Sequence, residues 1–226
     1  LRSEEPESAF DNRVITFELP DTLHQNLLEV ARKNRTTLNN IFRTLWGLLL
    51  AKYNDQRDAV FGAVVSGRPP QLPDSDEIVG LFINTVPVRV AFDAETGFGD
   101  LVRRVSTEAA DSEEFHHYPL AEIQNASELK QHLFDHIVVF ENYPVNAGLP
   151  GLKVGTETGK AESMLELIRE SVFSQNHYPF YIIVGTKPVL RLNFYYNREL
   201  YAEDLVRDLF GQFCLLAEQA ISQEAM

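Results

Sequence analysis

The chain has 226 residues, a formal net charge of −13 at pH 7, and 44% hydrophobic residues. This length suits one large domain or two small ones, and the composition is that of a globular protein. The negative charge argues against nucleic acid or an anionic membrane as a partner, because both are bound by basic faces. The single cysteine excludes an internal disulfide and favours a reducing, cytoplasmic setting.

The chain begins with a polar stretch, residues 1–11, that we expect to be a linker or disordered. Residues 14–19 then alternate at period two and predict a strand. Asp21 is expected to cap a helix over residues 23–33. Threonines follow at the start of a second helix, whose apolar residues recur at helical spacing and include Trp46, an expected core residue. Either of two side chains could cap this second helix: Thr36 or Thr37.

Two long strands separated by a polar loop are predicted in the middle of the chain. Residues 59–65 form a nearly continuous apolar run, which is typical of a strand buried on both faces. The loop at residues 66–78 carries three prolines and three acidic residues, so we expect it at the surface. Residues 83–92 predict the second strand. Asn84 lies inside it and needs hydrogen-bond partners, either because it ties a neighbouring loop to the sheet or because it lines a cavity.

Strands and helices continue to alternate after this point. They are a helix from about Leu101, a short helical turn after Pro119, strands at 135–141 and 164–173, a hairpin of 180–184 with 189–196, and a helix over 203–221. Residues 144–162 have four glycines, two prolines and no apolar period, which indicates an extended excursion. The order predicts an α/β fold with a mixed β-sheet and flanking helices. No G-x-G-x-x-G turn and no P-loop is present in the sequence.

Four runs resemble motifs of the condensation domains of nonribosomal peptide synthetases, and they occur in the family's order. GLFINTVPVR at residues 80–89 resembles the fifth core motif, and SGRP at 66–69 resembles the segment just upstream of it. HYPLAEI at 117–123 resembles the sixth motif, and FDHIVVFENYP at 134–144 resembles a further family segment. Four matches in order are more specific than any one of them.

The catalytic motif of that family, H-H-x-x-x-D-G, is not found in this sequence. After the pair His116 and His117, the positions that need Asp and Gly hold Ala121 and Glu122. The pair also lies after the segments that the catalytic motif precedes in the family. Neither a metal site nor a Ser-His-Asp system is favoured, because ligand spacing and a G-x-S-x-G elbow are missing. We therefore expect no catalytic residue and no metal in this chain.

The resemblance implies that residues 1–226 are the C-terminal lobe of a condensation domain, one half of a chloramphenicol-acetyltransferase-like fold. In the family, two lobes enclose a tunnel in which carrier-bound aminoacyl or peptidyl thioesters are joined by an amide bond. The expected partners are the N-terminal lobe, peptidyl carrier proteins and an adjacent adenylation domain. No cofactor is expected to bind directly; the phosphopantetheine belongs to the carriers. The motif at 80–89 looks like the version that joins an L-configured donor.

By the same resemblance, the loop at 66–78 corresponds to a floor segment under the tunnel and 144–162 to a latch that reaches the other lobe. Arg89 is expected to form a buried pair. The residues expected at the tunnel or lobe interface are Ser66, Arg68, Gly80, Phe82, Asn84, Thr85, Gln175 and Asn176. Two alternatives stay open: half of a coenzyme A-dependent acyltransferase of the same fold, or a non-catalytic carrier-binding module.

Overall fold

The computed structural model describes residues 12–68, 78–80, 82–141, 178–186 and 189–224. In chain order, its elements are β1 (Asn12–Glu18), α1 (Asp21–Lys33), α2 (Leu38–Tyr53), β2 (Asp58–Ser66), β3 (Ile83–Ala91), α3 (Phe98–Ser112), the 3-10 turn η1 (Glu113–Phe115), α4 (Leu120–Ala126), the 3-10 turn η2 (Lys130–His132), β4 (Ile137–Glu141), β5 (Phe180–Gly185), β6 (Arg191–Asn197) and α6 (Glu203–Glu224). The predicted strand at 164–173 and the predicted excursion at 144–162 lie outside the described residues.

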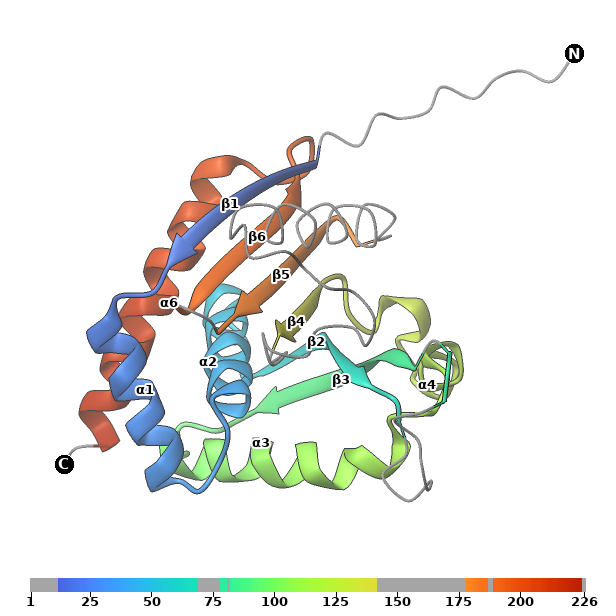
Figure 1. Ribbon diagram of the computed structural model, residues 1–226, viewed down its shortest axis with the longest axis horizontal. Helices are drawn as coiled ribbons and strands as arrows, with labels where there is room; N and C mark the ends of the chain where they lie inside the picture. Colours follow the sequence, from blue (N-terminus) through green and yellow to red (C-terminus); the bar gives the residue numbers. More distant parts are fainter. Residues whose placement is uncertain (1–11, 69–77, 81, 142–177, 187–188, 225–226) are drawn as a thin grey trace, which may run out of the picture.

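The strands form a six-stranded sheet in the order β1-β6-β5-β4-β2-β3. The three central strands β2, β4 and β5 run parallel, and the outer pairs β2/β3, β5/β6 and β1/β6 are antiparallel. The hairpin predicted near the C-terminal end is present, with Phe180 opposite Tyr196. Figure 1 shows the helices packed beside this twisted sheet, so the predicted mixed sheet with flanking helices is confirmed.

Helix α2 lies at the centre of the helical layer. It packs on β2 and β3 and is contacted by α1, α3 and α6. Because neighbours surround it, its middle is buried on every side, from Ile41 to Leu49 and at Ala51. Trp46 is fully buried, which confirms its prediction as a core residue. Alternate residues of the strands face this layer, such as Phe61 in β2, Val90 in β3 and Phe194 in β6.

The predicted helix starts are only partly correct. Thr37 caps α2, since its Oγ1 accepts a hydrogen bond from the backbone N–H of Asn40 at 3.2 Å. The prediction for Asp21 is wrong: Pro20 occupies the cap position and Asp21 is the first helical residue. The reason is that the chain stays paired to the sheet through Leu19, whose N–H donates to Leu190 O at 2.9 Å, and enters the helix directly after the proline.

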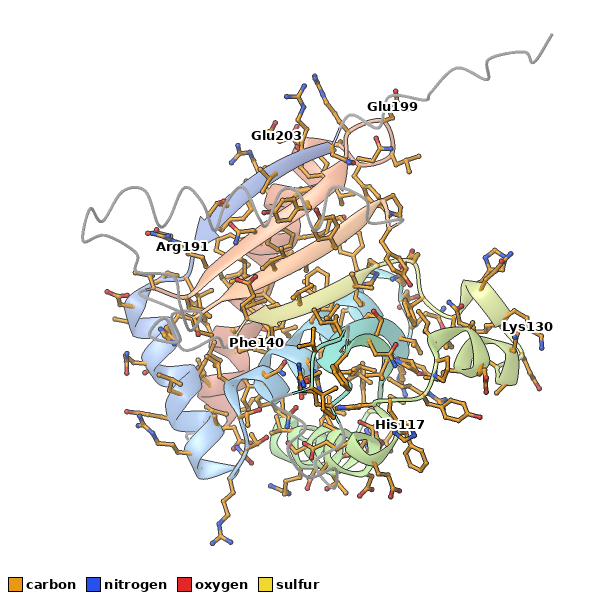
Figure 2. All side chains as sticks on the ribbon, turned by 45° about the vertical axis from the view of Figure 1, so that its right-hand side comes forward. His117, Lys130, Phe140, Arg191, Glu199 and Glu203 are labelled. Carbon is orange, nitrogen blue, oxygen red and sulfur yellow. The ribbon has the colours of Figure 1, made fainter. Side chains whose placement is uncertain are left out.

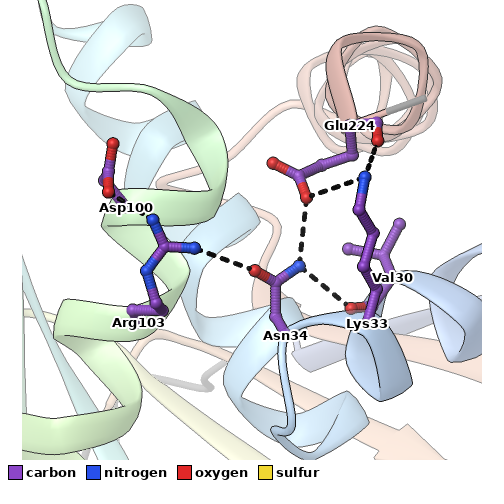
Figure 3. A network of polar contacts seen from close by, with 6 residues as sticks. All are labelled: Val30, Lys33, Asn34, Asp100, Arg103 and Glu224. Carbon is purple, nitrogen blue, oxygen red and sulfur yellow. Dashed lines mark hydrogen bonds and ion pairs between the residues drawn. The ribbon is translucent and has the colours of Figure 1, made fainter. Parts of the chain in front are cut away.

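The last turn of α6 is fastened to α1 and α3 by a polar network centred on Asn34 (Figure 3). The Asn34 Nδ2 donates to Val30 O at 3.1 Å and to Glu224 Oε2 at 3.2 Å, while its Oδ1 accepts from Arg103 at 3.4 Å. Lys33 pairs with the Glu224 carboxylate at 3.8 Å. The network fixes the relative positions of three helix ends.

None of the helices in the described part of the chain is long and apolar enough to span a bilayer.

Candidate functional site

Most of the predicted site residues lie together at one end of the sheet, where β2 ends and β3 begins. The antiparallel register places Ser66 opposite Ile83 and Val65 opposite Asn84. The residues that the structure brings to this end are Ser66, Arg68, Gly80, Phe82, Asn84 and Thr85. Gln175 and Asn176 lie outside the described residues, so their predicted roles stay predictions.

The aromatic ring of Phe82 organises the ends of the loop that joins the two strands. The Arg68 guanidinium carbon lies 4.2 Å from the centre of that ring, a cation–π distance, and Arg68 Nη1 donates to Ile78 O at 3.2 Å. The Gly67 N–H donates to Phe82 O at 2.6 Å. A Cβ on Gly80 would lie 3.4 Å from the same ring. Both ends of the loop are thus held close to the sheet.

The side-chain amide of Asn84 joins β3 to the segment between α3 and α4. Its Nδ2 donates to His116 O at 2.8 Å and to Tyr118 O at 2.7 Å. Its Oδ1 accepts from the Thr85 N–H at 2.9 Å. The segments approach closely here, since a Cβ on Gly67 would lie 3.0 Å from His116 O. Among the described residues, Asn84 therefore acts as a tie between a loop and the sheet.

Replacing Asn84 by alanine is expected to lower the free energy of unfolding by about 1–3 kcal/mol, because two loop carbonyls lose their donor. Urea denaturation of the variant and the parent measures this difference. Asn26→Ala, an exposed amide within α1, is the matched control and should leave the unfolding midpoint nearly unchanged. If the chain is one lobe of a two-lobed domain, as the sequence resemblance implies, the activity of the rebuilt domain should fall only as far as folding does. Abolished activity at unchanged stability would contradict the structural role.

The two adjacent histidines lie in different environments. The His116 ring is half-buried, with its Nε2 at 3.3 Å from Ser112 Oγ. Burial, and secondly the nearby Arg43 cation, lower the pKa of His116. His117 is exposed and lies in the segment between α3 and α4, where Figure 2 labels it. In the described ranges, no group of three or more His, Cys, Asp or Glu side chains is placed to hold a metal ion.

Arg89 forms an ion pair, although not the buried one that the sequence predicted. Its Nε lies 2.9 Å from Asp58 Oδ1 and its Nη2 lies 2.6 Å from Asp58 Oδ2. The hydrogen bond from Arg89 lowers the pKa of the Asp58 carboxyl. Both side chains are exposed, because the alternation along β3 turns Val88 and Val90 towards the helices and Arg89 away from them. The expected burial is therefore wrong.

A cleft of about 840 Å³ opens at the opposite end of the sheet, where the parallel strands begin, and it was not predicted. Its aromatic and acidic lining includes Trp46, Tyr53, Phe134, Asp135, Tyr178 and Tyr201. At its base, the Trp46 Nε1–H donates to His136 Nε2 at 3.0 Å. The ring proton of His136 therefore lies on Nδ1, which donates to Asp135 Oδ1 at 2.7 Å. The sequence did contain a signal for this cleft, because the polar pair Asp135 and His136 directly precedes a buried strand.

The hydrogen bond from His136 lowers the pKa of the Asp135 carboxyl. The stability that the ionised Asp135 carboxylate contributes is therefore present above the ordinary carboxyl pKa of about 4. It is lost as the pH falls through the lower pKa that Asp135 has in the folded chain. Asp135→Asn should reduce the free energy of unfolding near neutral pH by less than about 1 kcal/mol, because the carboxylate is solvent-screened.

Urea midpoints measured between about pH 3 and neutrality test this, since the ordinary carboxyl pKa lies in that window. The difference between parent and Asp135→Asn should shrink towards the acid end. Asp111→Asn, an exposed carboxyl on α3, should show no such trend. A difference that grows on acidification would refute the assignment.

Comparison with known sequences points to one family. The condensation-domain family matches residues 2–226 of this chain. Tyrocidine synthase 2 of Brevibacillus parabrevis is 37% identical over 210 residues, which are 93% of this chain and 6% of that protein. Bacitracin synthase 3 of Bacillus licheniformis is 35% identical over 218 residues, which are 96% of this chain and 3% of that protein. The chain therefore spans less than a tenth of the length of these curated relatives.

Solved structures agree on the fold. The first condensation domain of the CDA synthetase matches with a TM-score of 0.67 at 17% identity, over 92% of this chain and 45% of that chain. The condensation domain of the Monacolin K polyketide synthase MokA matches with a TM-score of 0.72 at 14% identity, over 97% of this chain and 50% of that chain. At these identities the likeness establishes fold alone, and the predicted chloramphenicol-acetyltransferase-like fold class is confirmed.

Proposed function

Because this chain belongs to the condensation-domain family of nonribosomal peptide synthetases, we propose that residues 1–226 are the C-terminal lobe of a condensation domain that forms peptide bonds between carrier-bound thioesters. The observation that carries this proposal is the GLFINTVPVR run on the β2–β3 hairpin. Its support is the coverage of 45% and 50% of two solved condensation domains by nearly the whole chain. The joining of an L-configured donor, and a cytoplasmic setting, are parts of the same proposal.

The proposed reaction divides its chemistry between the two lobes. The acceptor amine attacks the donor thioester carbon, a C–N bond forms, the C–S bond breaks, and the carrier thiol leaves while the amine loses a proton. Ala121 and Glu122 stand where the H-H-x-x-x-D-G pattern needs Asp and Gly, so we assign proton transfer to the other lobe. This lobe supplies a tunnel wall and a surface for the carriers. Its contribution is the positioning of two tethered substrates, which by itself can supply a large part of a rate enhancement.

Apolar side chains exposed at the predicted site support an interface there. Contiguous exposed apolar surface on a globular protein marks a contact for a partner or a ligand. The exposed residues at and beside this end of the sheet are Ile78, Val79, Ile83, Phe115 and Tyr118. We propose that the N-terminal lobe covers them, with Ser66, Arg68 and Asn84 at the rim of the tunnel.

The tunnel also has to admit the phosphopantetheine arms of the carriers, which hold the acyl groups as thioesters. The residues present fit such an arm: Phe82 and Ile83 offer apolar contacts to its uncharged chain, and Arg68 supplies a cation. Adjacent carrier and adenylation domains are the partners that this role requires.

The proposal is tested by producing this chain and the N-terminal lobe of its domain separately and measuring their association. The isolated chain should bind a hydrophobic dye, and the dye should be displaced when the other lobe is added. Ile83→Ser should weaken the association. Leu200→Ser should not, although Leu200 is an even more exposed apolar residue, which lies beyond the far end of β6. A chain that neither binds the dye nor associates with the other lobe would refute the two-lobed assignment and favour a self-sufficient binding module.

A further inference from the structure

Arg43 is a buried cation on α2 that has no partner in the described part of the chain. The residues around it on α2, from Ile41 to Leu49, are buried, and only 8% of the Arg43 surface is exposed. The guanidinium makes no hydrogen bond or ion pair with any described residue. Burial lowers the pKa of this group. The guanidinium nitrogens are not among the fully buried atoms, so the tip of this nearly covered cation still reaches the surface. A cation in such a place is stabilised by a counter-charge or by several hydrogen bonds.

A buried polar atom without a partner lies one turn earlier on the same helix, within the described ranges. Asn39 and Arg43 are four residues apart and therefore share a face of α2. The Asn39 Oδ1 is buried, and within the described ranges it has no hydrogen-bond partner. Buried polar atoms are nearly always satisfied in folded proteins. An unsatisfied buried oxygen beside an unpaired, nearly covered cation on one face of α2 indicates a site that is completed by a group outside the described residues.

The site lies at the end of the sheet where the proposed lobe contact is. The Arg43 cation acts on the His116 imidazole, and the His116 carbonyl accepts the hydrogen bond from Asn84. Helix α2 packs against β2 and β3, and Arg43 is in its first half. The exposed side chains of Ile83 and Phe115 belong to the same end. A partner that covers these apolar residues would also approach the guanidinium.

We propose that the other lobe of the domain places a carboxylate side chain against Arg43, beside Asn39, when the two lobes close; this rests on the two-lobed function proposed above. A carboxylate is the expected group because a guanidinium keeps its charge when buried and pairs with carboxylate through two parallel hydrogen bonds. A hydrogen-bond donor from the same segment of the other lobe satisfies the Asn39 Oδ1. Arg43 is then a positioning residue that sets how the lobes meet, and it does not touch the reacting atoms.

The test relies on Arg43→Met having a favourable or neutral effect on the stability of the isolated lobe and an unfavourable effect on the association of the two lobes. In the isolated chain, Arg43→Met should unfold at the same or a higher urea concentration than the parent, because a buried unpaired charge is removed. In the assembled domain, Arg43→Met should raise the Kd between the lobes by roughly tenfold or more. Arg43→Lys should retain part of the affinity. Arg32→Met, an exposed arginine on α1, is the control and should change neither quantity.

The carboxylate is identified by alanine substitution of the acidic residues of the other lobe, each combined with Arg43→Met in a double-mutant cycle. One acidic position should show strong coupling and the others none. Coupling to no acidic position, or a Kd that Arg43→Met leaves at the parent value, would overturn the pairing while leaving the two-lobed function in place. Parent lobes that do not associate at all would overturn the function as well, so the two failures are distinguishable.

Discussion

The isolated chain is expected to form no dipeptide above background when it receives donor- and acceptor-loaded carrier proteins. The reason is chemical: the positions after the histidine pair that need Asp and Gly hold Ala121 and Glu122, and the sequence contains no H-H-x-x-x-D-G pattern. Addition of the separately produced N-terminal lobe should restore peptide-bond formation. Mass spectrometry of the carrier-bound product measures both outcomes directly. Product should be absent with the isolated chain and present when the N-terminal lobe is added.

The histidine pair provides the control for this experiment. In the reconstituted domain, His117→Ala should retain the activity of the parent, because the His117 side chain is exposed. His116→Ala should also remain active, since the bond from Asn84 is accepted by the main-chain carbonyl of His116 and not by its ring. Dipeptide formation by the isolated chain that depends on either histidine would overturn the assignment of the catalytic base to the other lobe.

Replacement of Trp46 by alanine is expected to have the largest effect on stability, a loss of about 3–5 kcal/mol in the free energy of unfolding. Trp46 has 0% of its surface exposed. Its ring lies 6.2 Å from the Phe194 ring and 6.4 Å from the Phe180 ring, measured between centroids. Removing it opens a cavity at the centre of the helix–sheet contact and leaves His136 Nε2 without its donor. Such a loss is a large fraction of the stability of an ordinary domain.

Trp46→Phe separates the two contributions. It keeps much of the ring volume and removes the hydrogen bond to His136, so it should cost less than alanine, with about 1–3 kcal/mol due to the unsatisfied nitrogen. Tyr53→Ala, at the exposed end of the same helix, is the control and should change the urea midpoint little. A Trp46→Ala variant as stable as the parent would show that the cleft beside it collapses without cost, contrary to the packing described.

Much of the local structure was predictable because it depends on neighbours in the sequence. The period of α2 identifies Trp46 as a core residue, and the alternation of β1 and the apolar run of β2 identify these strands. The order of four motifs pointed to the family, and six of the proposed site residues lie in a stretch short enough to meet in one hairpin. Helix ends were predicted less well, as Asp21 shows, because pairing of Leu19 to a distant strand determines where α1 begins.

Contacts between distant segments were decided by the tertiary structure. The order β1-β6-β5-β4-β2-β3 places the first strand beside the last, and no local pattern encodes that pairing. Asn84 finds its acceptors 32 and 34 residues away, and Trp46 finds His136 at a separation of 90 residues. The strand order and the packing of α2 likewise decide that Arg43 is buried without a partner among the described residues, while Arg89 forms its pair in solvent. Periodicity along the chain tells which side of an element faces the core, but only the path of the chain determines which groups meet there.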